Sequence, residues 1–431
     1  MKKEYSLFLM SLFVILLAAC GNGEESGEVS AESEEKTKIE YWHVNAETQG
    51  GNTVNQLVEE LNAQSDTVEV VARYNPDMYA GLMSNMQAEV ASGNSPAVVQ
   101  VGWAFLDYFS ENFEYVEPQE VIENYHEEDT TFLEDNFLPN ILELGQNAEG
   151  TQVGIPYSLS NPILYINKDM LQEAGLDSEG PETWEEVREY SEAINKATGN
   201  YGVYIQEPAD SWGQQAMVES NGASFIDDGK ASFASDEGIE VFQYYQDLVN
   251  DELALHIGWD QGIQSFIDGN VGMLYTTIAQ RNNIESNASF DVTTLQSPTW
   301  EGKEKRVPAG GAMLSITAQD EEEQAAAWEF MKYLYSVESI AEWTKGTGYV
   351  PPREGVSDSE EGLKSFLEEN ELMIPAIEQM DSMVPWASFP GDSGIEAEQK
   401  LLDMRDIILG GDVDVEETVS NTEEEINDLL E

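Results

Sequence analysis

Hydrophobic and polar positions in the first quarter of the chain predict strands and helices in alternation. Lys38–Trp42 alternates with a period of two and Val68–Tyr74 is rich in β-branched residues, so both are expected to be strands. Between them, Val54–Leu61 has the spacing of an amphipathic helix. Met78–Ser92 is expected to be a second helix and Ala97–Val101 a buried strand. This order predicts an α/β lobe with a parallel sheet.

The rest of the chain continues this alternation around one informative stretch, Gly154–Trp184. There a polar segment, Ser158–Asn161, leads into an apolar run, Pro162–Ile166, as suits a passage between two lobes beside a ligand. Thr183, with Glu186 three residues later, predicts a capping box at the next helix. Further helices are expected at Trp184–Lys196, Trp212–Asn221, Ile239–Asn250, Gln261–Asp268, Gln324–Tyr335 and Ile340–Lys345, and strands at Tyr201–Ile205, Gly272–Thr277 and within Pro308–Ile316.

The amino terminus has the pattern of an export signal. Lys2 and Lys3 precede an apolar core, Leu7–Leu17, that is shorter than the roughly 20 residues a membrane span needs. Small residues then lead to Cys20, the single cysteine of the chain. This order is typical of a bacterial lipoprotein signal, with residues 1–19 removed and a lipid joined to Cys20; an ordinary secretory signal is the alternative. We therefore expect an exported protein that touches the outer face of the cytoplasmic membrane only through its lipid.

Residues 20–36 are rich in Gly, Ser and Glu and predict a flexible acidic tether. The remainder is too long for one compact core and predicts two lobes. The division expected from the patterns and from the resemblance below assigns 37–157 plus 277–334 to the N-terminal lobe and 158–276 plus 335–431 to the C-terminal lobe.

The charge is strongly acidic: 19 basic residues against 84 acidic ones leave a formal net charge of −65. Such a surface repels nucleic acid and anionic lipid, so neither is an expected partner. Most of this charge is expected to be a solvated coat suited to salty or alkaline surroundings. The sequence has no D-x-D-x-D-G loop, and its three histidines lie far apart, so neither a metal nor a cofactor is expected.

Several motifs together resemble one family. These are the Pro-Tyr and Pro-Ile-Leu-Tyr-Ile-Asn-Lys-Asp segments of Gly154–Trp184, the Ala-Gly-Leu and Thr-Trp that follow, and Thr347–Pro351. The chain resembles the extracellular solute-binding proteins of ABC importers, in the large carbohydrate-binding group, and within it the glycerol-3-phosphate-binding branch. The resemblance implies a type II periplasmic-binding-protein fold of the α/β class, with a ligand cleft between two lobes. It also implies three hinge crossings, expected near Tyr157–Ser160, Leu274–Thr277 and Tyr333–Ser336.

The resemblance also implies a monomeric binding protein that hands a small molecule to the membrane subunits of an importer. Carried over residue by residue, it places a ligand-contacting tyrosine at Tyr79 and a serine at Ser160. It places a stacking tryptophan at Trp212, a glycine at Gly310 and a tyrosine at Tyr349, with Thr277 nearest to a second serine. At Trp103 the branch has a ligand-binding glutamate instead.

A second departure concerns charge. The branch has an arginine that holds phosphate, whereas Pro390–Gln399 contains no basic residue and Glu396 falls near that place. Guanidinium is the natural partner of phosphate, so its absence disfavours an anionic ligand unless Arg281 or Arg353 substitutes. The sequence thus favours a sugar or polyol, with glycerol 3-phosphate or a glycerophosphodiester as the alternative.

Sugar recognition requires aromatic planes for the C–H faces and fixed polar groups for the hydroxyls. The loops after the first and third strands, Trp42–Glu47 and Gly102–Trp103, are candidates because ligands of open α/β sheets bind beyond the carboxyl ends of strands. Core packing is the competing interpretation of each aromatic ring; Trp184, Trp328 and Trp343 are assigned to the core, and Trp259, Trp300 and Trp386 stay open. The expected ligand-binding set is Trp42, Asn45, Tyr79, Trp103, Ser160, Trp212, Thr277, Gly310 and Tyr349.

Two other classes compete with a binding protein. A secreted carbohydrate-active enzyme would need a carboxylate pair, but close pairs arise by chance among so many acidic residues, and no catalytic motif is present. A structural surface lipoprotein is the other alternative. We therefore expect no catalytic residues.

Overall fold

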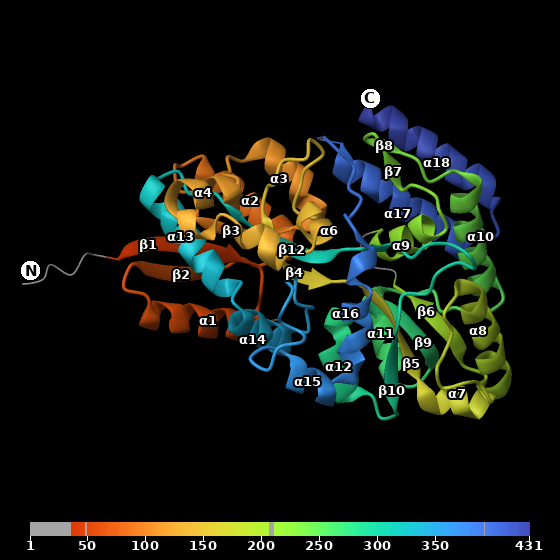
Figure 1. The fold of residues 1–431 in the computed structure, drawn as a ribbon. Coiled ribbons are helices and arrows are strands. Elements are labelled where there is room, and N and C mark those ends of the chain that lie inside the picture. Colours follow the sequence, from red (N-terminus) through yellow and green to blue (C-terminus); the bar gives the residue numbers. More distant parts are fainter. Residues whose placement is uncertain (1–35, 48–49, 207–210, 392) are drawn as a thin grey trace, which may run out of the picture. The chain divides into compact units, whose positions relative to one another are not determined.

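The computed structural model describes residues 36–47, 50–206, 211–391 and 393–431 (Figure 1). The predicted signal, Cys20 and most of the tether lie outside this range. In the described part no helix combines the length and the apolarity that crossing a membrane requires.

The first sheet has five strands in the order β2-β1-β3-β12-β4. Its strands are β1 (Thr37–His43), β2 (Val68–Tyr74), β3 (Val98–Gly102), β4 (Ile155–Ser160) and β12 (Gly310–Ile316). β1 is parallel to β2 and β3, and β12 is antiparallel to both β3 and β4. The carboxyl ends of β1, β3 and β4 therefore meet the start of β12 at one edge of the sheet.

The second sheet has four strands in the order β10-β5-β9-β6. They are β5 (Pro162–Asn167), β6 (Tyr201–Ile205), β9 (Val271–Thr277) and β10 (Val292–Gln296). β5 runs antiparallel to β9 and β10, and β6 is parallel to β9. A two-stranded parallel sheet, β11 (Val307–Pro308) with β13 (Met383–Val384), joins two later parts of the chain, and β7 (Ile226–Asp227) pairs with β8 (Lys230–Ala231).

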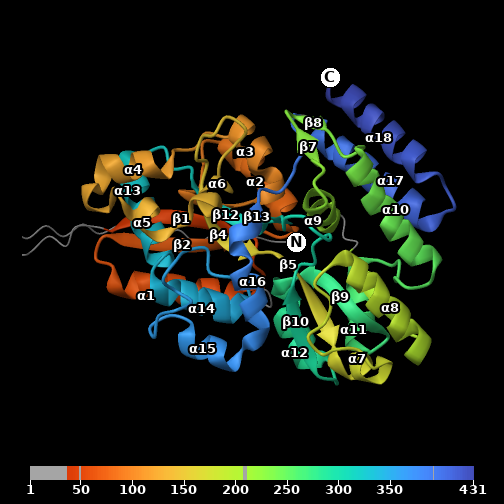
Figure 2. The ribbon, with the colours of Figure 1, turned by 45° about the vertical axis from the view of Figure 1, so that its right-hand side comes forward.

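Helices cover both sheets (Figures 1 and 2). Those in the first half of the chain are α1 (Gly51–Gln64), α2 (Met78–Val90), α3 (Leu106–Asn112), α4 (Pro118–Tyr125), α5 (Phe132–Asn136), α6 (Pro139–Glu143), α7 (Lys168–Ala174), α8 (Trp184–Thr198) and α9 (Trp212–Ser220). Those in the second half are α10 (Asp236–Asn250), α11 (Trp259–Ile267), α12 (Arg281–Asn287), α13 (Glu321–Leu334), α14 (Val337–Thr347), α15 (Lys364–Glu369), α16 (Ile374–Glu378), α17 (Gly394–Gly410) and α18 (Val415–Leu430). The capping box predicted at Thr183 is present, because Thr183 and Glu186 each accept the other's backbone N–H at the start of α8.

Alternation along the strands of the second sheet divides the apolar interior. On β5, Ile163 and Tyr165 pack in the core that continues through the first sheet, whereas Leu164 and Ile166 pack in a second core under α8, α9, α10 and α17. All four side chains are fully buried because each face of the sheet carries helices. The α/β fold expected from the sequence is thus confirmed.

Asn161 carries the chain from the first sheet to the second, at the end of the expected crossing Tyr157–Ser160. Its side chain is fully buried, donates to the carbonyl of Ala376 at 2.8 Å and accepts from Gln379 at 2.7 Å. The backbone N–H of Ile278 donates to its carbonyl at 3.1 Å. These bonds fix the passage from the first sheet to the second.

At the other two expected crossings, the strand pairing shows no passage between the sheets. Leu274–Thr277 lies inside β9, and the chain stays in the second sheet until β10 has paired with β5. Tyr333–Ser336 lies between α13 and α14, which both cover the first sheet; Tyr335 packs edge-on against Tyr157 at 5.7 Å. The chain leaves the first sheet only after Val350, whose N–H donates to Leu159.

On this pairing we propose lobes that differ from the expected division. The first comprises residues 37–160 with 310–350, and the second comprises 162–296 with 374–431. The boundaries expected at 277 and 335 came from the crossings that the resemblance implies. Hydrophobic spacing identifies helices such as α14 but not the sheet on which each one packs.

Candidate ligand-binding site

Three of the expected ligand residues meet at the edge of the first sheet. Gly310 pairs with Ser160 across β12 and β4. A Cβ on Gly310 would lie 2.5 Å from the Ser160 Oγ and 3.0 Å from the Trp212 ring. The Trp212 indole, on the first turn of α9, donates its N–H to the carbonyl of Pro308 at 3.1 Å. Because glycine has no side chain, the indole of one lobe approaches the strand end of the other.

Tyr79 and Trp103 lie at the neighbouring strand end. A Cβ on Gly102 would be 2.6 Å from the Tyr79 ring, so the phenol packs directly over the end of β3. Trp103 follows at the next position; its side chain is 97% buried and its Nε1 has no hydrogen-bond partner among the described residues. Before Tyr79, Asp77 and Met78 both have left-handed backbone angles, φ 64° and 55°. Such strain in residues other than glycine is concentrated at functional sites.

Tyr349 stacks on Trp343, and Asn45 lies near the same indole. The Tyr349 ring lies parallel to the Trp343 indole with centroids 6.0 Å apart, and the turn that places it depends on Gly348 at φ +82°. A Cβ on Gly50 would lie 3.5 Å from the Asn45 amide nitrogen and 3.6 Å from the Trp343 ring. The side chain of Asn45 is 94% buried.

Burial raises the pKa of the Tyr349 phenol and raises the pKa of Tyr79 well above its usual range. The neighbouring phenols of Tyr349 and Tyr41 add to the upward shift at Tyr79 because phenolates would repel one another. Both rings therefore stay neutral at ordinary pH. A neutral phenol both donates and accepts hydrogen bonds, as recognition of a hydroxyl requires.

Trp42 and Thr277 have other roles in the structure. Trp42 is 99% buried, donates its N–H to Glu40 at 2.8 Å and lies under the Arg73 guanidinium, 4.2 Å from the ring centroid. Thr277 ends β9, where its hydroxyl accepts the N–H of Ala279 and caps the next turn. These contacts favour a structural role for both residues.

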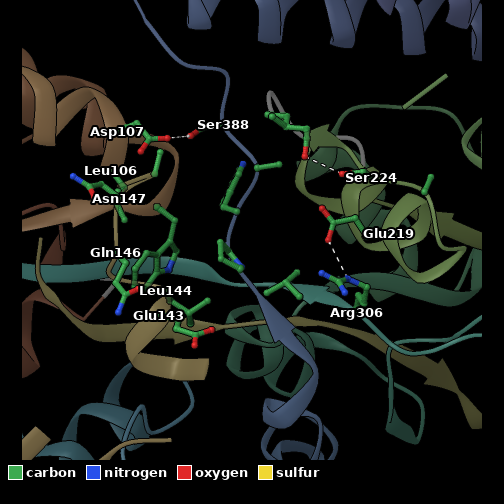
Figure 3. Close-up of a pocket in the computed structure, with 18 of the residues that line it drawn as sticks. Leu106, Asp107, Glu143, Leu144, Gln146, Asn147, Glu219, Ser224, Arg306 and Ser388 are labelled. Carbon is green, nitrogen blue, oxygen red and sulfur yellow. Dashed lines mark hydrogen bonds and ion pairs between the residues drawn. The ribbon is translucent and has the colours of Figure 1, made fainter. Parts of the chain in front are cut away.

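Beyond Trp103 the structure has a pocket of about 690 Å³ (Figure 3). Its first wall comes from α3 and the loop after α6, with Leu106, Asp107 and Asn147; the opposite wall comes from the end of α9 and from Arg306. Figure 3 shows Asp107 and Asn147 on one side of the cavity and Glu219, Ser224 and Arg306 on the other. The described residues that line it are Trp103, Leu106, Asp107, Glu143, Leu144, Gln146, Asn147, Ala148, Glu219, Gly222, Ala223, Ser224, Ile226, Arg306, Val384, Pro385, Trp386, Ala387 and Ser388.

The last residue of β13 and the loop after it, residues 384–388, form a third wall that the sequence analysis did not predict as part of the site. Its Trp386 ring lies 6.1 Å from the Trp212 ring, inclined by 31°. The position of Trp386 in a loop after Pro385 was the available sequence signal, but a single loop tryptophan does not tell a site from a core.

Carboxylates outnumber cations around this pocket. Asp107, Glu143 and Glu219 line it, whereas Arg306 is the one cationic side chain among the described lining residues. The Arg306 guanidinium pairs with Glu219 at 3.5 Å. Burial raises the pKa of Glu219, while the Gln215 amide and Arg306 oppose this shift.

The two arginines considered as substitutes for a phosphate ligand are engaged elsewhere. Arg281 is buried and bonds Glu285 at 3.0 Å and Asn370 at 3.3 Å. Arg353 donates to the carbonyl of Tyr335 at 2.7 Å and lies over the Phe132 ring. Neither lines the pocket.

A metal centre is not indicated where ligand types do cluster. His126, Glu128 and Asp129 lie close enough to share an ion. However, the Lys332 ammonium pairs with Asp129 at 2.5 Å, and the Trp328 N–H donates to the same carboxylate at 2.9 Å. The positive charge that this carboxylate requires is thus supplied by the chain itself.

Three solved structures share this fold over 91–92% of the chain. A cyclic α-maltosyl-1,6-maltose binding protein from Arthrobacter globiformis has a TM-score of 0.80 at 21% identity, and the alignment spans 99% of its chain. UgpB from Mycobacterium tuberculosis in complex with glycerophosphocholine has a TM-score of 0.78 at 20% identity, over 99% of its chain. Maltose-bound MalE3 from T. maritima has a TM-score of 0.72 at 19% identity, over 99% of its chain.

Sequence relatives and a family model give the assignment. The sn-glycerol-3-phosphate-binding periplasmic protein of Pectobacterium atrosepticum is 27% identical over 75% of each chain. That of Escherichia coli K12 is 26% identical over 81% of this chain and 82% of its own. The model described as bacterial extracellular solute-binding protein matches residues 56–368. That match covers well over half of the chain, so this chain belongs to the bacterial extracellular solute-binding proteins, which bind solutes for transporters and are not enzymes.

Proposed function

We propose that this protein captures a neutral sugar or polyol outside the cell and delivers it to the membrane subunits of an ABC importer. The ligand would lie at the edge of the first sheet, among Tyr79, Trp103, Ser160, Gly310 and Tyr349. Trp212 would approach from the second lobe. These residues supply indole and phenol planes for the C–H faces of a sugar. They also supply hydroxyl groups, and backbone polar groups left accessible by glycine, for the hydroxyls around its rim.

The charge around the adjoining pocket carries the preference for a neutral ligand. Three carboxylates face it, and its arginine already neutralises one of them. A phosphate entering here would meet net repulsion and no free guanidinium, which is its natural partner. Hydroxyl groups, in contrast, donate readily to carboxylates.

Hinge closure is the proposed means of capture. The Trp212 indole of the second lobe lies within contact of Gly310 on the first, so ligand contacts would differ between open and closed forms. A ligand favours closure only through that difference in affinity. The buried bonds of Asn161 would hold the crossing while the lobes move.

Tethering would keep the receptor at its importer. We propose that Cys20 carries the lipid and that the acidic segment 20–36 is the linker, so that the protein is anchored to the outer face of the cytoplasmic membrane. A monomer suffices, because both walls of the site belong to one chain.

Glycerol 3-phosphate or a glycerophosphodiester is the second candidate. The proteins from Pectobacterium and Escherichia are named for glycerol 3-phosphate, and the Mycobacterium structure holds glycerophosphocholine. A choline group would suit the carboxylates and indoles here, but its phosphate would still need a cation.

Mass spectrometry of protein purified without denaturation tests this function directly. Released hexoses, oligosaccharides or polyols are the expected result. Release of phosphorylated glycerol compounds alone would reject the neutral ligand and favour the second candidate.

A further inference from the structure

We propose that Trp386 is a ligand-contact residue and that the pocket it walls holds the further units of a neutral oligosaccharide. This inference rests on the proposed function and narrows it from sugars in general to ligands of two or more rings. Trp386 would provide the plane on which a unit beyond the first is stacked.

The size and position of the pocket support an elongated ligand. A volume of about 690 Å³ lies within the ~300–1,000 Å³ range of pockets that take drug-sized molecules, which are larger than one sugar ring. The pocket begins at Trp103, next to the Tyr79 ring that packs on Gly102. A first sugar at the strand ends would therefore have its neighbour in this pocket.

The walls carry the chemistry that a sugar chain requires. Trp103 and Trp386 supply indole planes, and Gln146, Asn147 and Ser388 supply neutral polar groups. The Asn147 carbonyl oxygen accepts the N–H groups of Glu149 and Thr151, which fixes its orientation. The Trp103 N–H has no acceptor in the described protein, and a buried donor of this kind is costly unless a ligand or water satisfies it.

Hydrogen bonds hold Trp386 in its place on both sides. From α9, the Gln215 side chain donates to the carbonyl of Pro385 at 2.9 Å and accepts the N–H of Ala387 at 3.0 Å. On the other side, the Ser388 hydroxyl donates to Asp107 on α3 at 3.2 Å (Figure 3). The segment 384–388 thus bonds elements of both lobes, and the indole between these bonds is positioned before a ligand arrives.

The test uses the full chain and a homologous series of neutral sugars: glucose, maltose and maltotriose, together with matched β-linked, xylose- and galactose-based series. Native mass spectrometry and calorimetry would measure binding to the wild type, to Trp386→Leu and to Trp386→Phe. We expect the wild type to bind at least one series with affinity that rises from the single sugar to the disaccharide. Trp386→Leu should weaken disaccharide binding about tenfold, whereas Trp386→Phe, which keeps a plane, should retain most of it.

The possible results distinguish a failure of the oligosaccharide inference from a failure of the sugar-binding function. If single sugars bind as tightly as longer chains, or if Trp386→Leu leaves affinity unchanged while its melting temperature shows a folded protein, the oligosaccharide inference is wrong and the sugar function stands. If the wild type binds no member of any series, the sugar function is rejected, and the inference with it.

Discussion

Gly310 has a special place among the residues of the site because two partners occupy the space that a side chain would take. The Ser160 hydroxyl can rotate away from a new methyl group, but the Trp212 ring belongs to a helix of the second lobe. Adding a single carbon at this position would therefore push the indole away from the strand end.

Gly310→Ala is expected to weaken ligand binding about tenfold, because the new methyl group displaces Trp212 from the strand end. Calorimetry with the ligand released from the native protein measures the loss. The melting temperature serves as the control and should fall only slightly. Unchanged affinity in a folded variant would place the ligand away from this edge.

His43, at the end of β1, makes the stability of the protein depend on pH. Its Nδ1 accepts the N–H of Asn45, and burial lowers the pKa of the imidazole from 6.5 to about 4. Between these values the unfolded chain binds a proton that the folded chain rejects. Stability contributed by the neutral imidazole is therefore complete above pH 6.5 and is lost as pH falls towards 4, by up to about 3 kcal/mol.

Denaturant unfolding of the wild type and His43→Asn at pH 7.5 and pH 4.5 measures this loss. Asparagine keeps an acceptor for Asn45 but does not titrate in this range. We predict that, on acidification, the free energy of unfolding of the wild type falls relative to that of the variant. Because both proteins carry the same carboxylates, this comparison cancels the effects of those groups. A constant difference between the two proteins would show that His43 is not protonated on unfolding.

At the scale of elements, β12 shows how local backbone geometry positions the site. Gly311 has φ +105°, and the β12–β4 register shifts between Ala312 and Met313. A Cβ on Gly311 would be 2.1 Å from the Ser158 carbonyl oxygen. This irregularity sets where Gly310 meets Ser160.

Gly311→Ala is expected to destabilise the protein by several kcal/mol, because strain at positive φ adds to a clash with backbone. The matched control is Gly150→Ala, at φ +80° with open space around the new Cβ, which should cost only about 1 kcal/mol. Equal losses in chemical denaturation would mean that the contact with Ser158 relaxes and that only the dihedral angle matters.

Helices and strands were largely predictable from the sequence, whereas the elements and residues against which they pack were not. The β-branched run of Val68–Tyr74 and the capping box at Thr183 identify β2 and α8 because these signals are local. Trp343 was assigned to the core, and it is buried there, yet its ring lies beside Tyr349. Trp386 joins the pocket because its neighbours Ala387 and Ser388 bond to Gln215 and Asp107, which are distant in sequence, and such pairing leaves no periodic trace.

The whole molecule carries a formal net charge of −65, which must repel itself in the folded state. Salt screens such repulsion, with a Debye length of about 30 Å at 0.01 M and about 10 Å at 0.1 M. The melting temperature is therefore predicted to rise by several degrees from 10 to 150 mM sodium chloride, a range in which screening dominates. Differential scanning calorimetry measures it; a flat or falling curve would show that the acidic coat is already neutralised by bound cations.

We propose, above all, that the two lobes bind a neutral, hydroxyl-rich solute without converting it. A melting scan against neutral sugars, polyols and glycerol phosphates, with product analysis of each mixture, tests it most directly. We expect a higher melting temperature with at least one neutral ligand, no shift with glycerol 3-phosphate and no product. Stabilisation by glycerol phosphates alone, or turnover of any sugar, would contradict it.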